Sequence, residues 1–436
     1  MKSLLEKLAE FTTWLIPGMG VKRWLLIILL GTTLLGVGLG IMLLEIYRTA
    51  PDTWWLPALS TASLRFLPRP LRVIIFGGLG IGLVLFGILE LNRAIIKPFL
   101  RPGDRVATAV RSHRQRGRGP RVVAIGGGHG LAALLRGIKP YTNNITAIVT
   151  MADDGGSSGR LRQELGILPP GDIRNCLAAL SSDEALLAQL FQYRFGNGNA
   201  GLDGHSFGNL FISALADITG SFESAVAESG KVLATQGQVL PSTLHDVRLQ
   251  ADVRLPHTDS QVRIYGESQI PMSNGKVRHV WIEPENPPAF PQAIQAILAA
   301  ELIVVGPGSL YTSILPNLLV PDLMHALRAS RALKLFICNV ATEKGETTGY
   351  NSGDHIRVIE EHISDRLFDV VIANRRYEGK IPATIDWVRI EPGMEEEYSV
   401  YAADLVDNLY PWRHDSTKLG QAIMDIFQER TGPLVE

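Results

Sequence analysis

The stretch "RVVAIGGGHGLAALLRGI", residues 121–138, decides the fold. Its apolar start is typical of a strand that is buried on both faces of a parallel sheet. A glycine-rich loop follows, and Leu131, Leu134, Leu135 and Ile138 then repeat at helical spacing. A second apolar run, residues 145–151, completes a strand–loop–helix–strand unit. The sequence therefore predicts an α/β fold with a mostly parallel sheet.

The later part of the chain repeats this pattern after an interruption. Residues 301–305 form an apolar run that leads into "GPGSLYTS", and the runs at 333–340 and 369–374 follow. Between the two units, residues 246–283 alternate between apolar and polar positions and contain the turn "SNG". Alternation with a turn residue cluster predicts a β-rich insertion or antiparallel extension.

Apolar residues are concentrated near the N-terminus of this 436-residue chain, of which 46% is hydrophobic. Residues 24–44 carry no charge and have about the length of a bilayer crossing, and residues 73–89 form a slightly shorter uncharged run. Interfacial tryptophans, Trp24, Trp54 and Trp55, flank these runs. We expect two transmembrane helices within residues 1–100, although a pair of buried core helices has the same composition.

Basic residues flank the expected hairpin on its outer ends, so the positive-inside rule places the large C-terminal part in the cytoplasm. We predict that residues 101–120 form a basic linker and that residues 121–436 form one domain. The net charge of −1 gives no electrostatic argument for nucleic acid as a partner. Cys176 and Cys338 lie in apolar surroundings without disulfide or zinc spacing, which fits a reducing compartment.

Unusual loops follow the expected strands. In open parallel sheets, ligands bind beyond the carboxyl ends of the strands. Glycine-rich or polar loops stand at these ends, at residues 126–130, 153–159, 306–309 and 339–348, and at Asn374. This coincidence predicts a single ligand cleft.

The first loop, "GGGHG", consists of Gly126, Gly127, Gly128, His129 and Gly130. Such a loop lets the backbone approach a phosphate, whose charge is met by N–H groups at the start of the following helix. It departs from the dinucleotide-binding fingerprint, because the next required glycine would be at position 131, which is a leucine. A tight strand–helix turn is the other interpretation.

Two adjacent acids, Asp153 and Asp154, open the second loop, "ADDGGSSGR", in which Gly155, Ser157 and Ser158 follow. Three interpretations stay open. Asp, Gly and Ser all favour turns. One acid could bind the ribose of a nicotinamide cofactor. Two acids could hold Mg2+ beside a phosphate loop.

Further candidate ligand residues lie at helix starts and loops. Asp172 in "PPGDIRN" is either a helix N-cap or a site residue. The remaining candidates are Arg174, Asn175, His205, Asn209, Gly306, Gly308, Ser309, Thr312, Asn339, Thr347 and Arg413. No nucleophile elbow is visible, and we assign no catalytic residue.

Six ordered motifs together resemble the gluconeogenesis-factor (YvcK) branch of the CofD-like family. They are "AIGGGHGL", "TMADDGGSSGRLR", "LPPGDIRNCLAAL", "GHSFGNL", "VVGPGSLYTSILPNLLV" and "GETTGY", and the resemblance covers residues 121–436. The N-terminal hairpin looks like that of longer, membrane-anchored members. One departure is "TEKGET", residues 342–347, which has Glu-Lys where Gln-Pro is expected.

The resemblance implies a Rossmann-like domain. The CofD branch is a 2-phospho-L-lactate transferase that uses a nucleoside-diphosphate-linked donor and a divalent metal. The YvcK branch is thought to bind UDP-sugars such as UDP-N-acetylglucosamine, and it is linked to gluconeogenic growth, envelope synthesis and cell shape. Carried over by motif, Asp153 and Asp154 would lie at the metal–diphosphate end with Mg2+ as the only cofactor. The two glycine loops would cradle phosphates, and Asn209, Asn339 and Arg413 would contact ligand.

Two functions remain in competition. The favoured one is a nucleotide-sugar-binding regulator, tethered to the cytoplasmic membrane with its large domain in the cytoplasm. The alternative is a metal-dependent transferase of the CofD type. A nicotinamide oxidoreductase is disfavoured by the glycine spacing. The sequence leaves the oligomeric state open, a homo-oligomer included.

Overall fold

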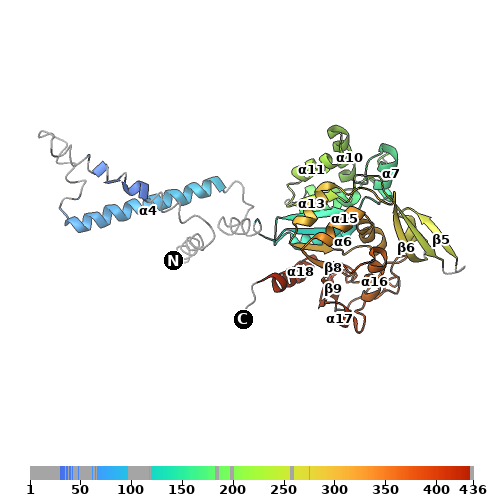
Figure 1. Ribbon diagram of the computed structural model, residues 1–436. Helices are drawn as coiled ribbons and strands as arrows, with labels where there is room; N and C mark the ends of the chain where they lie inside the picture. The colour runs from blue at the N-terminus through green and yellow to red at the C-terminus, as the bar shows by residue number, and fades with distance from the viewer. Residues whose placement is uncertain are drawn as a thin grey trace. The chain divides into compact units, whose positions relative to one another are not determined.

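The computed structural model describes residues 66–96 and 119–432, except 182–185, 197–200, 256–259 and 274, together with residue 117 and isolated positions between 30 and 64. The chain divides into two compact units, Met1–Gln115 and Arg116–Glu436. Figure 1 shows both units.

The N-terminal unit contains one long helix, α4 (Arg69–Ile96), which covers the second expected membrane span. Among the described residues, Pro70–Ile88 is the one stretch of helix that is long and apolar enough to cross a membrane. Ile74, Leu79 and Phe86 along it are exposed. The first expected span, residues 24–44, lies mostly outside the described residues, so the two-helix hairpin stays a prediction.

A seven-stranded sheet forms the centre of the C-terminal unit, in the order β10-β9-β8-β7-β1-β2-β3. Every neighbouring pair is parallel, as expected from the buried apolar runs. The strands are β1 (Val122–Gly126), β2 (Ile145–Val149), β3 (Gln238–Pro241), β7 (Leu302–Val305), β8 (Leu333–Ile337), β9 (Val370–Asn374) and β10 (Val400–Ala403). The edge strands β3 and β10 are four residues long and were not anticipated.

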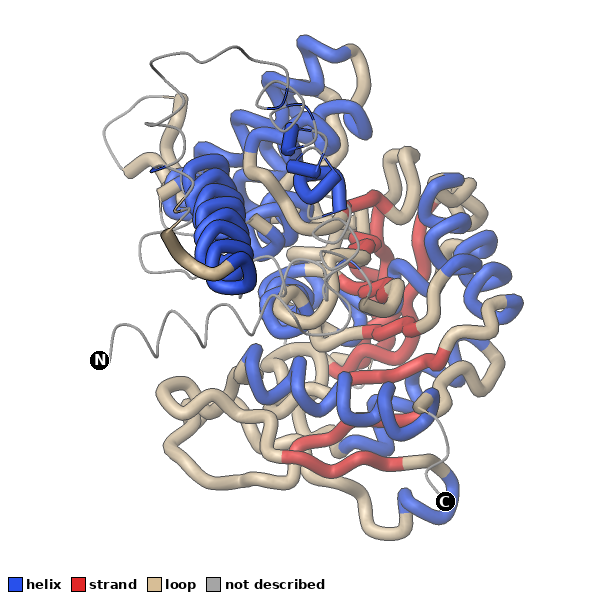
Figure 2. The backbone as a smooth tube through the Cα atoms, turned by 90° about the vertical axis from the view of Figure 1, so that its left-hand side faces the viewer, coloured by secondary structure: helices blue, strands red, loops and turns tan. Residues whose placement is uncertain are grey.

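Helices cover both faces of this sheet (Figure 2). The crossovers β1–α6–β2 and β7–α15–β8 run in opposite directions along the sheet. Because such crossovers are right-handed, they place their helices on opposite faces. One layer holds α6 (Gly128–Ile138), α8 (Gly171–Leu180) and α18 (Ser416–Thr431), and the other holds α13 (Pro291–Ala299) and α15 (Pro321–Ala329).

Two glycines allow α18 to approach α6 closely. A Cβ atom at Gly137 would collide with the backbone at Ser416, and one at Gly420 would collide with the backbone of Gly137. This contact fixes the start of α18, and with it the chain segment that precedes α18.

The β-rich insertion is confirmed as an antiparallel sheet with the order β5-β4-β6. Its strands are β4 (Arg248–Arg254), β5 (Gln261–Tyr265) and β6 (Lys276–Glu283), which Figure 1 shows at one end of the unit. Leu249, Ala251 and Val253 of β4 are buried, whereas Arg248 and Arg254 are exposed. The remaining elements are α7 (Gly156–Leu165), α9 (Leu187–Gln192), α10 (Phe207–Thr219), α11 (Phe222–Val232), α12 (Gln269–Met272), the π-helical turn η2 (Leu310–Ile314), α14 (Leu315–Leu318), α16 (Ser352–Ile363) and α17 (Met394–Glu397).

The strand order reverses between β1 and β7. From this point the chain builds β2 and β3 on one side and β8, β9 and β10 on the other. In doubly wound sheets, a crevice opens beyond the carboxyl ends of the strands at this switch point. The loops that follow β1 and β7, residues 127–130 and 306–309, are therefore neighbours.

Candidate functional site

A cavity of about 780 Å³ lies at this switch point. Its volume is in the range usual for small-molecule sites, roughly 300–1,000 Å³. The walls come from the loops after β1, β2, β7 and β8, from α8, and from the segment before α18. The lining residues include Gly127, Gly128, His129, Gly130, Arg136, Asp153, Asp172, Glu267, Gly308, Ser309, Thr312, Asn339, Glu343, Tyr410, Trp412, Arg413 and His414. The four loops that predicted a single cleft thus border one cavity, whereas Asn374 does not line it.

The glycine loop is shaped by its neighbours. The helix α6 begins at Gly128, whose φ of 63° favours glycine. A Cβ atom at Gly127 would collide with the carboxylate of Asp172 and lie 3.1 Å from Thr150. The N–H of Gly128 favours the charged form of this carboxylate. The positive end of the α6 dipole therefore faces a carboxylate in the cavity wall.

Asp172 is not the N-cap of its own helix. Pro170 occupies the cap position of α8 without a side-chain hydrogen bond, and Asp172 lies in the first turn. Burial and the nearby Asp153 raise the pKa of Asp172 to about 7. Asp172 lines the cavity, and its carboxylate lies against the glycine loop that precedes α6. The geometry therefore agrees with a site residue and not with an N-cap.

Asp153 and Glu267 complete an acidic part of the wall. Burial raises the pKa of Asp153, while the N–H of Gly155, 2.9 Å from its Oδ1, and the hydroxyl of Ser158 favour its charged form. Burial and three neighbouring aspartates raise the pKa of Glu267 to about 8. Sequence reasoning missed Glu267, because it belongs to the β-rich insertion and no motif marks it.

Asp154 faces away from this cavity. Its Oδ1 accepts the N–H of Ser268 at 2.9 Å, and it lines a second, smaller cavity together with Arg162, Arg248 and Tyr265. The two adjacent aspartates therefore do not share one site. Within the described ranges, no group of three or more His, Cys, Asp or Glu side chains is placed to hold a metal ion.

The motifs "GGSSGR" and "GHSFGN" meet behind the acidic wall. His205 Nδ1 lies 3.0 Å from Ser157 Oγ, and Asn209 Nδ2 donates to Ser157 Oγ at 3.1 Å and to Ser158 Oγ at 3.5 Å. None of these four side chains lines the cavity. They hold the start of α7, and through Ser158 they support Asp153.

Arg174 and Asn175 lie in the first turn of α8 and are also buried behind the wall. Arg174 Nη2 donates to Asn175 Oδ1 at 2.9 Å, and Gln192 Nε2 donates to the same oxygen at 3.2 Å. Neither Arg174 nor Asn175 lines the cavity. Their predicted contact with a bound anion is therefore indirect, through the charge of Arg174 near Asp172 and His129.

The second glycine loop differs from a simple anion loop. The hydroxyl of Ser309 donates to Glu343, and Thr312 Oγ1 donates to Glu346 Oε1 at 3.2 Å. Asn339 Oδ1 accepts the N–H of Gly308 at 3.1 Å. The hydroxyls expected to meet a phosphate are thus occupied by carboxyl groups.

Two more residues of this region serve the structure. Gly306 does not line the cavity, and its φ of 80° places it in the left-handed region that favours glycine. The fully buried Thr347 accepts the N–H of Glu343 with its Oγ1 at 2.9 Å. We infer no ligand contact for either.

A further part of the wall is basic. Arg136, in the last turn of α6, and Arg413 both line the cavity. Among the described residues, neither forms an ion pair with a carboxylate. Burial and four arginines, Arg413 foremost, lower the pKa of His129, which favours its neutral form. Arg136 carried no motif signal in the sequence, because it follows the glycine loop by one and a half helical turns.

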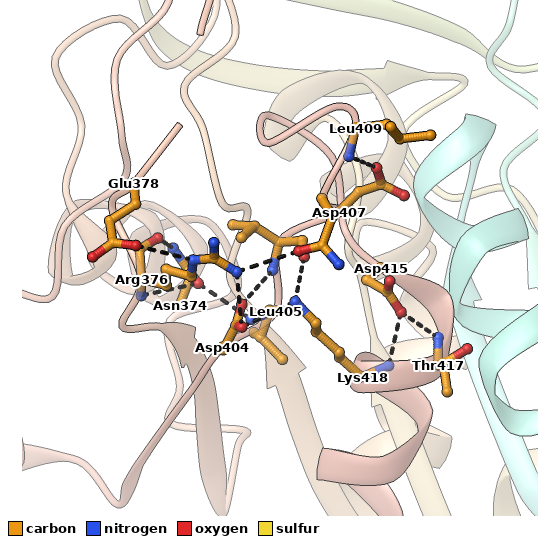
Figure 3. Close-up of polar contacts among 12 residues, drawn as sticks. Asn374, Arg376, Glu378, Asp404, Leu405, Asp407, Leu409, Asp415, Thr417 and Lys418 are labelled. Atoms are coloured by element: carbon orange, nitrogen blue, oxygen red, sulfur yellow. Dashed lines mark hydrogen bonds and ion pairs between the residues drawn. The ribbon is translucent and has the colours of Figure 1, made fainter. Parts of the chain in front are cut away.

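The segment between β10 and α18 carries Tyr410, Trp412, Arg413 and His414 into the wall. A polar network fastens this segment at its ends (Figure 3). Asp404 Oδ2 lies 2.9 Å from Lys418 Nζ and 3.3 Å from Arg376 Nη1, and Lys418 Nζ also donates to the carbonyl of Val406 at 2.9 Å. Asp415 caps α18 by accepting the N–H groups of Thr417 and Lys418.

Asn374, at the end of β9, belongs to the same network. Its Oδ1 accepts the N–H groups of Arg376 at 3.2 Å and Leu405 at 3.3 Å. The polar residue that the sequence analysis noted at this strand end therefore holds the segment and does not line the cavity.

The fold and the cavity define a doubly wound α/β protein with a polar, ligand-sized site at its switch point. The family model described as 2-phospho-L-lactate transferase CofD matches residues 122–420. A protein of Nostoc sp. is 50% identical over 381 residues, which cover 85% of this chain and 80% of that protein. The chain belongs to the CofD family, and within it to the gluconeogenesis-factor branch.

Two further comparisons support this assignment. The protein of Bacillus subtilis named gluconeogenesis factor is 43% identical over 328 residues, which cover 72% of this chain and all of that protein. The crystal structure of a UPF0052-family protein of Bacillus halodurans aligns with a TM-score of 0.64 and 40% identity, over 70% of this chain and 99% of that one. The Rossmann-like core predicted from the motifs is confirmed.

His414 allows a test of the cavity wall. Both of its ring nitrogens are buried and lack a partner among the described residues, and burial lowers its pKa to about 4. Between pH 6.5 and 4 the unfolded chain binds a proton here that the native chain does not. The free energy of unfolding should therefore decrease as the pH is lowered from 6.5 to 4, by up to about 3 kcal/mol.

The variant His414→Gln should remove this part of the pH dependence in denaturant titrations. The part due to His362, whose pKa burial also lowers to about 4, would remain. Substitution of the exposed His245 by Gln provides the control and should leave the slope unchanged. Equal slopes for the parent and His414→Gln would show that the imidazole is charged or exposed in the native chain.

Proposed function

We propose that this protein is a membrane-tethered, cytoplasmic nucleotide-sugar-binding regulator, with a ligand of the UDP-N-acetylglucosamine type. The observation that carries the proposal is the composition of the cavity. A glycine loop at a helix N-terminus faces the same space as Arg136 and Arg413, neither of which forms an ion pair with any residue that the structure describes. Backbone N–H groups and arginines are the groups that bind diphosphates in proteins.

The rest of the wall fits the uncharged part of such a ligand. Ser309, Asn339 and Trp412 offer hydroxyl, amide and aromatic surface, as carbohydrate and base groups require. The relatives carry the name gluconeogenesis factor. We therefore propose that the bound nucleotide sugar couples central carbon metabolism to envelope synthesis and cell shape.

The binding proposal predicts a thermal shift. UDP-N-acetylglucosamine should stabilise the fragment Arg116–Glu436, which forms a compact unit by itself. The variant Arg136→Gln should bind about tenfold more weakly, because a charge-assisted contact is lost. Arg328→Gln, which removes an exposed arginine paired with Asp365, is the matched control. No stabilisation of the parent fragment at millimolar ligand would refute the proposal.

A metal-dependent transferase is the second candidate, and the acidic wall favours it. Asp153 and Asp172 lie beside the glycine loop, and burial together with a neighbouring aspartate raises the pKa of each. Carboxylate oxygens of this kind suit Mg2+. With Mg2+ bound, the ion would neutralise a diphosphate at this wall, while Asp153 and Asp172 would hold it in place.

This alternative predicts an Mg2+ requirement. Mg2+ should tighten nucleotide-sugar binding to the parent, and Asp153→Asn should abolish that effect while keeping the fold. For transfer itself, a nucleoside-diphosphate-linked donor and a deazaflavin acceptor should release nucleoside monophosphate. If Asp153→Asn responded to Mg2+ as the parent does, this role of Asp153 would be wrong. If no nucleoside monophosphate were released, the transferase alternative would be refuted, and the nucleotide-sugar-binding regulator would stay as the proposed function.

The membrane tether rests on the apolar runs at residues 24–44 and 73–89. The second run is helical, and by the rise of the α-helix its 28-residue helix α4 is about 42 Å long, enough to cross the roughly 30 Å hydrocarbon core. The full chain should sediment with membranes and resist alkaline extraction, whereas a chain lacking residues 1–115 should stay in solution. Release of the full chain by alkali would contradict the tether.

A further inference from the structure

Glu343 lies in the cavity wall, in the loop that follows β8. The hydroxyl of Ser309 donates to its Oε2, and Asn339 Nδ2 donates to its Oε1 at 3.4 Å. Asn339 Nδ2 also donates to the carbonyl of Gly308 at 2.9 Å. The two carboxyl oxygens of Glu343 therefore fix the positions of Ser309 and Asn339, which both line the cavity.

No cation balances this carboxyl group. In the described part of the chain, no basic side chain forms an ion pair with Glu343, and the adjacent Lys344 is exposed. Other acids face the same region: Glu346 is buried behind it, and Glu267 lies in the wall near Glu346. Each additional negative charge here would repel an anionic ligand.

Burial raises the pKa of Glu343, and burial together with Glu343 and Glu267 raises that of Glu346. A protonated glutamic acid has the shape of glutamine and offers one donor and one acceptor. Ionisation of Glu343 therefore turns a neutral hydrogen-bonding side chain in the wall into a negative charge.

We propose that Glu343 is a specificity-determining residue that makes ligand binding pH-dependent. When protonated, it holds Ser309 and Asn339 toward the uncharged sugar part of the ligand, as glutamine would. When ionised, it adds a negative charge to a wall that already carries Asp153, Asp172 and Glu267, and it weakens binding of the diphosphate. This inference rests on the proposed function, because it concerns the same cavity.

The direction of the change in ligand affinity with pH follows from the raised pKa of Glu343. Affinity is full at pH values where Glu343 is protonated, and it falls as the pH rises through the pKa of the folded protein. Asp172 and Glu267 titrate in the same cavity, with pKa values of about 7 and 8. They weaken binding with rising pH in the same sense. Their contribution would persist in a variant that changes Glu343 alone.

The test measures the dissociation constant of UDP-N-acetylglucosamine for the full chain in detergent between pH 4.5 and 9, by calorimetry, so that the range begins at the ordinary pKa of a glutamate. Its diphosphate keeps a constant charge over this range. The parent should lose affinity with rising pH, and Glu343→Gln should reduce that loss by about tenfold. Glu360→Gln, which changes an acid on α16 that binds Tyr398, is the matched control and should behave as the parent does.

Parallel pH profiles for the parent and Glu343→Gln would overturn the inference. If Glu343→Gln failed to fold, Ser309→Ala would decide instead: without the hydroxyl that favours the charged form of Glu343, the loss of affinity should move to higher pH, and an unmoved profile would overturn the inference. A folded parent that binds the nucleotide sugar at no pH would refute the proposed function instead, so the two failures are distinguishable.

Discussion

The close approach of the Asp172 carboxylate to the glycine loop is the contact on which the site depends. It joins the first turn of α6 to the first turn of α8, two helices that touch along the same face of the sheet. A side chain at Gly127 would collide with that carboxylate, so the glycine loop can close only without a Cβ atom there. The same contact places a carboxylate where a helix N-terminus favours an anion. A phosphate that enters must therefore share this helix end with Asp172 or bring a cation.

The charges of the cavity follow from this arrangement. Asp153 and Glu267 stand near Asp172 and disfavour each other's ionisation, while Arg136 and Arg413 have no carboxylate partners among the described residues. Burial and the neighbouring carboxylates disfavour the charged forms of Asp172 and Glu267, whereas Arg136 and Arg413 are exposed to solvent in the cavity wall. A ligand that carries a diphosphate beside neutral hydroxyl groups would suit both parts of this wall, because arginines bind anions and neutral acids bind hydroxyl groups. A purely anionic ligand would satisfy only the arginines.

Much of the fold could be predicted because the buried strands appear in the sequence as continuous apolar runs. The strands β1, β2, β7 and β9 are buried at every residue, and all four were expected. The edge strand β10 was not, since its residues are half-exposed and too few to show a pattern. For the site, the glycine loop and Asp153 were found by their place at strand ends. Arg136 and Glu267 were missed, because residues without a motif enter a site only through the tertiary fold.

Residues of a shared motif do not all face the ligand. His205 and Asn209 were expected in the site, yet they bind Ser157 and Ser158 from behind. This arrangement fixes the first turn of α7, whose preceding residue Gly155 donates its N–H to Asp153. The hydroxyl of Ser158, which Asn209 contacts, and the N–H of Gly155 both favour the charged form of Asp153, against the burial that raises its pKa. The motif "GHSFGN" therefore supports the cavity wall through Ser158 without lining the cavity itself.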